Sequence, residues 1–236
     1  MADEYKYLTY KADDFIAKSA ELIAQSLRQA ISLRGMASLM VSGGRSPAKV
    51  YQALSHIDLP WDKVAIGLVD ERCVSAGQSG SNADFVARNL LQNKADKARF
   101  IGLEVDRPKS KARLSAYEIN LAPLQPFDIC VMGMGLDGHT ASWFPNAVGL
   151  DAALDMTNQK TVVAINAIGC AVAGDYPERI SLTLSAVLKS QHVILMIAGA
   201  QKAAVFDESL GYSMAQRPVT ALLAAGPRLT VLTDEI

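Results

Sequence analysis

The residues best suited to do chemistry in this chain of 236 residues lie in one glycine-rich stretch. An apolar run, 127–132, is typical of a buried strand, and three glycines, Asp137 and His139 follow it before Pro145. A histidine ordinarily titrates at about pH 6.5, so His139 suits the role of a general base whose ring Asp137 orients. The plainer alternative is a histidine that only forms hydrogen bonds within a glycine turn.

The glycines of this stretch also match the dinucleotide-binding pattern G-x-G-x-x-G, from Gly133 to Gly138. That pattern normally opens a long helix whose N-terminus carries the pyrophosphate, whereas here Pro145 stands shortly after the glycines. We therefore reject a nicotinamide site. The two other histidines, His56 and His192, are expected to be structural or exposed.

A second loop has the composition of an anion-binding turn. Ser42-Gly43-Gly44-Arg45 stands between an apolar strand and a helical pattern. Glycines let backbone N–H groups approach an anion, and a helix N-terminus adds partial positive charge. Arg179 and Lys202 could contribute further positive charge toward a phosphate. The same loop suits a tight strand-to-helix turn without any ligand, and the sequence pattern alone leaves both open.

Three consecutive charges, Asp70-Glu71-Arg72, follow another apolar strand, where ligand-facing residues are expected. Taken alone, they favour a solvated loop or an internal Asp–Arg pair. No histidine, cysteine or carboxylate pair around His139 has metal-ligand spacing, so we expect no metal site. A serine nucleophile elbow, G-x-S-x-G, is missing as well.

Composition narrows the class of protein. The formal net charge of −1 gives no reason to expect nucleic acid or an anionic membrane as partner. Three cysteines without a C-x-x-C pair favour reduced thiols and a cytoplasmic protein. The first residues lack the apolar core of a secretion signal, and the apolar run 193–200 is too short to cross a bilayer.

Apolar strands alternate with helical patterns along the chain. Strands are predicted at 36–41, 64–69, 99–103, 127–132, 161–167 and 193–198, with a last edge strand at 229–232. Helices are predicted from a cap at Asp13 or Asp14 to Gly35, over a segment with Pro47 in its first turn, from a cap at Ser81 or Asn82, over 111–121, and up to Leu210; a polar loop is predicted at 75–80. This alternation indicates an α/β protein with a mostly parallel sheet, folded as one domain over 1–236.

Together the segments resemble the 6-phosphogluconolactonases, relatives of glucosamine-6-phosphate deaminase. The matching segments are Ser42-Gly43-Gly44-Arg45-Ser46-Pro47, Asp70-Glu71-Arg72 with Ser81-Asn82, Gly133 to Pro145, Glu178-Arg179-Ile180-Ser181 and Gly199-Ala200-Gln201-Lys202-Ala203. The stretch Asp-Gly-His-Thr-Ala-Ser, which ends in Phe-Pro, is the most specific. Arg45, Cys73 and Trp143 depart from the residues common in the family, and none of them removes a catalytic group.

The resemblance implies a Rossmann-like sheet flanked by helices, of the glucosamine-6-phosphate deaminase and ribose-5-phosphate isomerase type. It implies hydrolysis of 6-phospho-D-glucono-1,5-lactone without a cofactor. We separately expect a monomer or small homo-oligomer. The implied catalytic residues are His139 as the base, Asp137 as its orienting group, and Arg72, held by Asp70, for developing negative charge. The implied substrate-binding residues are Ser42, Gly43, Gly44, Arg45, Asn82, Arg179 and Lys202.

Two other functions remain open at this stage. An amino-sugar phosphate isomerase or deaminase would use Asp70 as base for the C2 proton. The deaminases, however, resemble one another in an Asn-Glu-Pro segment where this chain has Ser142-Trp143-Phe144-Pro145. A non-catalytic sugar-phosphate-binding domain would keep the anion loop and would have no need of His139.

Overall fold

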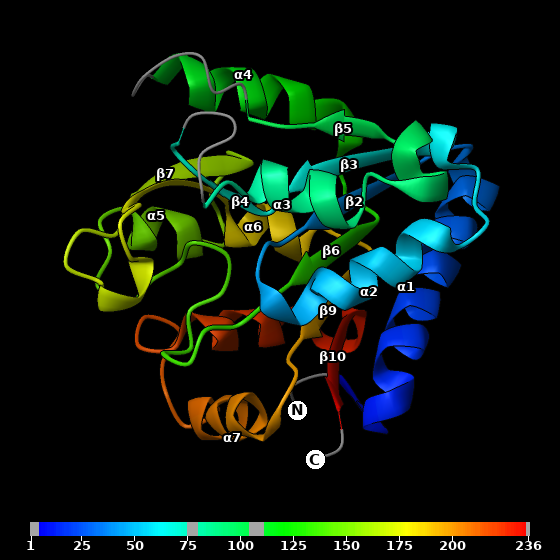
Figure 1. The fold of residues 1–236 in the computed structure, drawn as a ribbon. Helices are drawn as coiled ribbons and strands as arrows, with labels where there is room; N and C mark the ends of the chain where they lie inside the picture. The colour runs from blue at the N-terminus through cyan, green and yellow to red at the C-terminus, as the bar shows by residue number, and fades with distance from the viewer. Residues whose placement is uncertain (1–4, 75–79, 104–110, 235–236) are drawn as a thin grey trace.

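A seven-stranded sheet forms the centre of the computed structural model, which describes residues 5–74, 80–103 and 111–234. The strand order is β1-β10-β9-β6-β2-β3-β5, and every neighbouring pair is parallel (Figure 1). This confirms the predicted α/β class. The strands are β1 (Lys6–Tyr10), β2 (Ala37–Val41), β3 (Val64–Leu68), β5 (Arg99–Ile101), β6 (Ile129–Met132), β9 (His192–Met196) and β10 (Leu229–Asp234).

Helices flank this sheet, and short 3₁₀ turns connect several of the elements. The α-helices are α1 (Ala12–Arg34), α2 (Arg45–His56), α3 (Asn82–Asn89), α4 (Lys111–Leu121), α5 (Leu150–Leu154), α6 (Leu184–Leu188) and α7 (Ala200–Ser209). The 3₁₀ helices are η1 (Trp61–Lys63), η2 (Asn93–Lys97), η3 (Ala122–Leu124), η4 (Ala171–Ala173) and η5 (Pro218–Arg228). No helix within the three described ranges is long and apolar enough to cross a membrane.

Helix ends follow the predicted signals with one exception. Gly35 ends α1 in the left-handed conformation, and the Ser81 side chain caps α3 by accepting a hydrogen bond from the Asp84 N–H, at 3.2 Å. The predicted cap at Asp13 or Asp14 is wrong, because α1 begins at Ala12. Both aspartates lie in its first turn, where negative charge favours the helix dipole.

The predicted edge position of residues 229–232 is also wrong. The strand exists as β10, but β1 covers it, with Lys6 to Tyr10 pairing in register with residues 230–234. The sequence around β1 gave no strand prediction, because its half-exposed residues pair with a segment more than 200 residues away. Residues 1–4, on which the expected lack of a secretion signal depends, and most of the predicted loop 75–80 lie outside the described residues.

A second, three-stranded antiparallel sheet lies beside the carboxyl ends of the central strands. Its order is β4 (Asp70–Arg72), β8 (Glu178–Leu182) and β7 (Val162–Asn166). Val69 connects the two sheets: its N–H donates to Val41 of β2, and its carbonyl accepts from Leu182 of β8. Asp70-Glu71-Arg72, which were predicted to follow a strand, therefore form a strand of their own, β4.

The sheet order fixes where a site can form. Strand β6 lies between β9 and β2, so the loops that follow these three strands meet at one edge. In parallel sheets, ligands bind beyond the carboxyl ends of the strands. The small sheet and the loops after β7 lie at the same edge and close the site from the side (Figure 1).

Candidate active site

A cleft opens at the carboxyl ends of β2, β6 and β9. All the sequence-predicted site residues except Asp137 line it, and Asp137 contacts His139 from behind. The cleft is thus assembled from loops that are far apart in the sequence. The lining residues are Ser42, Gly43, Gly44, Arg45, Ser46, Pro47, Asp70, Arg72, Asn82, Gly133, Met134, Gly135, His139, Ala141, Phe144, Val172, Arg179 and Lys202.

The His139 ring is held by the turn that follows β6. Its Nδ1 lies 2.5 Å from Oδ1 of Asp137, and both side chains keep about a quarter of their surface exposed. Burial raises the pKa of Asp137, but the hydrogen bond and the charge of His139 outweigh it and hold that pKa below its ordinary value. A carboxylate on Nδ1 leaves Nε2 as the nitrogen available to a substrate.

Gly135 makes room for this pair. A Cβ atom at Gly135 would lie 2.2 Å from Cε1 of His139 and 2.6 Å from Oδ1 of Asp137. The His139 ring also packs on Phe144, with 4.4 Å between ring centroids. Phe144 also lies under the guanidinium of Arg179, at 5.4 Å. The imidazole is therefore confined between backbone and an aromatic ring.

The N-termini of two helices, α2 and α7, lie at the cleft, which Arg45 of α2 and Lys202 of α7 line. Gly44 precedes α2 at φ 109°, Gly199 precedes α7 at φ 90°, and neither helix has a side-chain cap. Positive φ values of this size favour glycine. Uncapped N–H groups of a helix N-terminus are donors available to an anion. Gly43 is required for a different reason, because a Cβ there would lie 2.1 Å from Oδ1 of Asn82.

Positive charge gathers at these N-termini. Lys202, on α7, donates to the Ser46 hydroxyl on α2 over 3.1 Å. Burial and the nearby Arg45 guanidinium lower the pKa of Lys202. Both causes disfavour the charged ammonium, and a bound anion would offset them. Ser42 supports this view, since its buried Oγ has no hydrogen-bond partner among the described residues.

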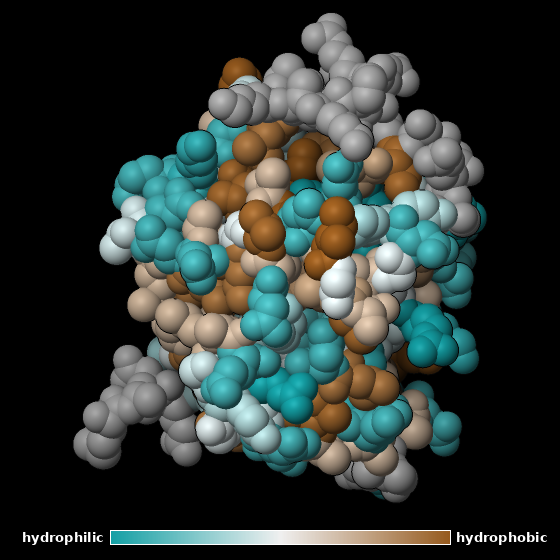
Figure 2. Space-filling view, turned by 90° about the vertical axis from the view of Figure 1, so that its left-hand side faces the viewer, coloured by the Kyte–Doolittle hydropathy of each residue, from teal (hydrophilic) through white to brown (hydrophobic). Residues whose placement is uncertain are grey.

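Apolar side chains line part of the cleft. They are Ala141, Phe144 and Val172. Figure 2 faces the side of the molecule that carries α5 and β7 and shows apolar residues mixed with hydrophilic ones. Large exposed apolar residues in the connections before and after these two elements are Val148, Met156, Ile168 and Val172.

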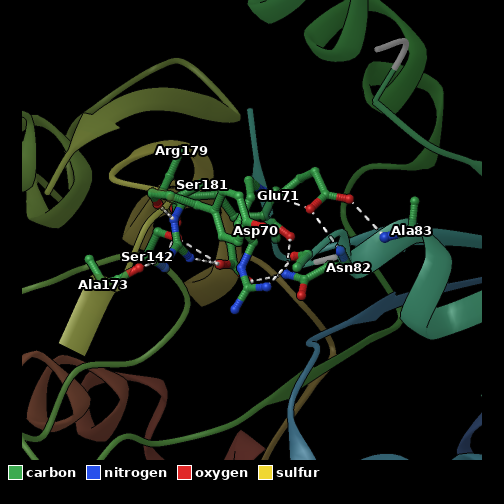
Figure 3. Close-up of polar contacts among 12 residues, drawn as sticks. Asp70, Glu71, Asn82, Ala83, Ser142, Ala173, Arg179 and Ser181 are labelled. Carbon is green, nitrogen blue, oxygen red and sulfur yellow. Dashed lines mark hydrogen bonds and ion pairs between the residues drawn. The ribbon is translucent and has the colours of Figure 1, made fainter. Parts of the chain in front are cut away.

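Asp70 is the centre of a buried network between the two sheets (Figure 3). Its Oδ2 accepts a 2.6 Å hydrogen bond from the Ser142 hydroxyl, and its Oδ1 accepts one from the Asn82 amide at 3.3 Å. The nearest guanidinium is that of Arg179, whose Nη1 lies 4.0 Å from Oδ2. The expectation that Asp70 holds Arg72 is therefore wrong: among the described residues, the ion pair of Asp70 is with Arg179.

Arg72 and Arg179 are held in different ways. Arg72 donates to the Gly80 carbonyl, and its buried Nε has no partner in the described part of the chain. Arg179 donates to the carbonyls of Ala173 and Tyr176, at 2.8 and 2.5 Å. Burial lowers the pKa of Arg179, partly offset by the charge of Asp70. Arg179 is thus fixed on three sides, whereas the Arg72 side chain, which also lines the cleft, has one hydrogen bond to the described residues.

Three residues of this region had no predicted role: Glu71, Ser142 and Ser46. The Glu71 carboxylate accepts from the backbone N–H groups of Asn82 and Ala83 at the start of α3 (Figure 3). Burial raises its pKa in spite of these bonds. Ser142 and Ser46 carried no signal beyond membership of matching segments, because their partners come from other elements. Among the described residues, no group of His, Cys, Asp and Glu side chains could hold a metal ion.

Comparisons with known proteins point in one direction. A family model described as glucosamine-6-phosphate isomerases/6-phosphogluconolactonase matches residues 10–231. A 6-phosphogluconolactonase of Mesorhizobium japonicum is 40% identical over 207 residues, which cover 87% of this chain and 84% of that protein. The crystal structure of a 6-phosphogluconolactonase from Shewanella baltica is 36% identical, with a TM-score of 0.91 over 100% of both chains. A monomeric glucosamine-6-phosphate deaminase, at 19% identity, shares the fold, with a TM-score of 0.79 over 98% of this chain and 97% of its own.

Proposed function

Because this chain belongs to the glucosamine-6-phosphate isomerase/6-phosphogluconolactonase family, we propose that it is a 6-phosphogluconolactonase. It would hydrolyse 6-phospho-D-glucono-1,5-lactone to 6-phospho-D-gluconate, the second step of the oxidative pentose phosphate pathway. The observation that carries this proposal is one cleft in which the His139–Asp137 pair faces a cationic, glycine-rich anion site. A cytoplasmic location and a monomer or small homo-oligomer remain predictions.

The chemistry assigned to His139 is the activation of water. With Nδ1 directed at Asp137, Nε2 takes a proton from a water molecule that adds to C1 of the lactone. The tetrahedral intermediate collapses by breaking the bond to the ring oxygen, which receives the proton back from the imidazolium. Because a lactone carbonyl is already activated, hydrolysis needs only one general base and a positive group that stabilises the oxyanion of the tetrahedral intermediate.

We assign the stabilisation of the developing oxyanion to the guanidinium of Arg72, because Arg72 lines the same cleft as His139 and carries a positive charge. The substrate phosphate would lie at the other end, against the backbone of Gly43 and Gly44 and the cations Lys202 and Arg45. Phosphate at a helix N-terminus is a favoured arrangement because N–H groups and the helix dipole both attract it.

The contacts of Asp70 weigh against the deaminase alternative. A base for the C2 proton needs a carboxylate oxygen free to face the sugar. Here Oδ2 accepts from Ser142 and faces Arg179, and Oδ1 accepts from Asn82. Asp70 is only 7% exposed, so its role is to hold the network. A purely binding domain is disfavoured because nothing in phosphate binding requires the confined His139–Asp137 pair.

A coupled assay tests the proposal. The lactone is generated in situ with glucose-6-phosphate dehydrogenase, and its disappearance with and without the purified protein is compared with spontaneous hydrolysis. We expect clear acceleration by the protein, a loss of roughly 10²–10⁴-fold in kcat for His139→Ala, and unchanged kcat for His56→Ala at an exposed histidine. No acceleration by the folded protein would refute the lactonase function.

A further inference from the structure

The segment that follows α7 supports the catalytic turn from outside the cleft. Arg217 Nη1 donates a 2.7 Å hydrogen bond to the backbone carbonyl of Asp137. The N–H of Val219 donates to the carbonyl of Gly138 at 2.9 Å. In Figure 1 this orange and red part of the chain runs beside the green loop that follows β6. The two carbonyls between Asp137 and His139 are thus both bonded to one distant segment.

The Arg217 side chain also fills the space left by a glycine. A Cβ atom at Gly138 would lie 2.6 Å from Cδ of Arg217, so the arginine stem packs directly on this backbone. Gly138 has φ +78°, a value that favours glycine, so the turn has no side chain of its own at this position. Close packing of this kind leaves the backbone at Gly138 little room to move.

Arg217 is itself held at its far end. Its guanidinium lies over the Tyr212 ring at 5.2 Å, and Nη2 is 3.8 Å from Oε1 of Glu208 near the end of α7. Its backbone N–H donates to the carbonyl of Ser213. The side chain is about three-quarters buried. The arginine is therefore a rigid link between α7 and the turn that carries the base.

From these contacts we infer that Arg217 is a positioning residue for the His139–Asp137 pair. It does not line the cleft, so it acts through Asp137. Arg217 holds the backbone of Asp137, and the orientation of the Asp137 carboxylate depends on that backbone. The carboxylate in turn orients the imidazole ring of His139. This inference rests on the proposed role of His139 as the base.

Kinetics of three variants separate positioning from a merely structural role. In the lactonase assay, Arg217→Met should lower kcat roughly 10- to 100-fold with KM changed less than twofold, because a small misplacement of a base slows the chemical step. Arg217→Lys keeps a donor and should recover part of the loss. Arg228→Met is the matched control: Arg228 also donates to backbone carbonyls, those of Leu188 and Ser190, but outside the cleft.

The kinetic result has clear opposing outcomes. An unchanged kcat in folded Arg217→Met, or an equal loss in Arg228→Met, would overturn the inference. If Arg217→Met does not fold, as judged by circular dichroism, Arg217→Lys decides: a lower kcat than wild type at equal KM supports positioning, and wild-type kcat contradicts it.

A second measurement does not depend on activity. The ring signals of His139 can be assigned in an NMR spectrum by their disappearance in His139→Asn. We expect these signals to shift in Arg217→Met and Arg217→Lys and to stay in place in Arg228→Met. A wild-type protein without lactonase activity would refute the proposed function, whereas unmoved His139 signals would refute the role of Arg217.

Discussion

At the scale of single residues, the base depends on neighbours that the histidine motif alone does not reveal. Asp137 contacts Nδ1, and Gly135 leaves the room in which both side chains lie. The sequence predicted the pairing of His139 with Asp137, since two residues in one turn are necessarily close. The sequence predicted the wrong arginine as the partner of Asp70. The actual partner, Arg179, comes close to Asp70 because β4 pairs with β8.

Gly135→Ala should displace the imidazole. The added Cβ would lie 2.2 Å from Cε1 of His139, a distance that real contacts do not reach, so the ring or the turn must move. We expect kcat to fall at least about tenfold, with a loss of about 1–3 kcal/mol in the free energy of unfolding. At Gly133 a Cβ would meet only Ser42 Oγ, at 3.6 Å, so Gly133→Ala should retain more activity. The reverse order of activities would contradict this prediction.

Asp137→Asn should impair the base while leaving the fold intact. An asparagine can offer an N–H to Nδ1, which would favour the tautomer with its proton on Nε2, the nitrogen that must accept one from water. We expect kcat to fall roughly 10- to 1,000-fold with little change in KM or melting temperature. Steady-state kinetics beside a thermal melt check this, and wild-type kcat would exclude the orienting role of Asp137.

At the scale of elements, the cleft is made by strand-to-helix junctions. The sequence predicted two of them, at Ser42 to Arg45 and at Gly199 to Lys202, because glycine before a helix is a local signal. The resemblance implied that the two junctions meet at one substrate, but the local patterns could not predict it, because the meeting requires β2 and β9 to lie on either side of β6. The Lys202–Ser46 contact is the direct result of that order.

Lys202→Met should weaken binding of the phosphorylated substrate specifically. A charged hydrogen bond to phosphate contributes about 1.5–3 kcal/mol, which corresponds to a rise in KM of roughly 10- to 100-fold. An unphosphorylated gluconolactone should be hydrolysed as slowly by the variant as by wild type. Lys49→Met, at an exposed lysine on α2, is the control. Equal losses on both lactones would disprove a phosphate contact of Lys202.

At the scale of the whole molecule, the features that could not be predicted from the sequence are those in which a strand pairs with a distant part of the chain. The alternation of apolar strands and helices predicted the α/β class, because each such segment carries its own pattern. Strand β1 and the pairing of β4, β8 and β7 had no such pattern, since each depends on a partner elsewhere in the chain. The prediction of an edge at β10 failed for the same reason.

A partly buried histidine outside the cleft makes the stability of the whole fold sensitive to pH. His192 Nδ1 lies 3.0 Å from Oγ of Ser26 on α1, and Nε2 lies 2.9 Å from Oγ1 of Thr230 on β10. Burial, with a smaller contribution from Lys6, lowers the pKa of His192 from 6.5 to about 4. Above pH 6.5 the ring is neutral in both the folded and the unfolded chain, so its contribution to stability is complete.

Between pH 6.5 and 4 the unfolded chain binds a proton at His192 that the folded chain refuses, so the free energy of unfolding falls as the pH falls. The loss attributable to this ring from pH 7 to pH 5 is about 2 kcal/mol. Urea unfolding at the two pH values measures the change in the free energy of unfolding. The difference between wild type and His192→Gln gives the part of that change that is due to His192. His56→Gln, at an exposed histidine, should keep the wild-type difference. A His192→Gln protein with the same pH dependence as wild type would show that this ring is protonated as readily in the folded state as in the unfolded one.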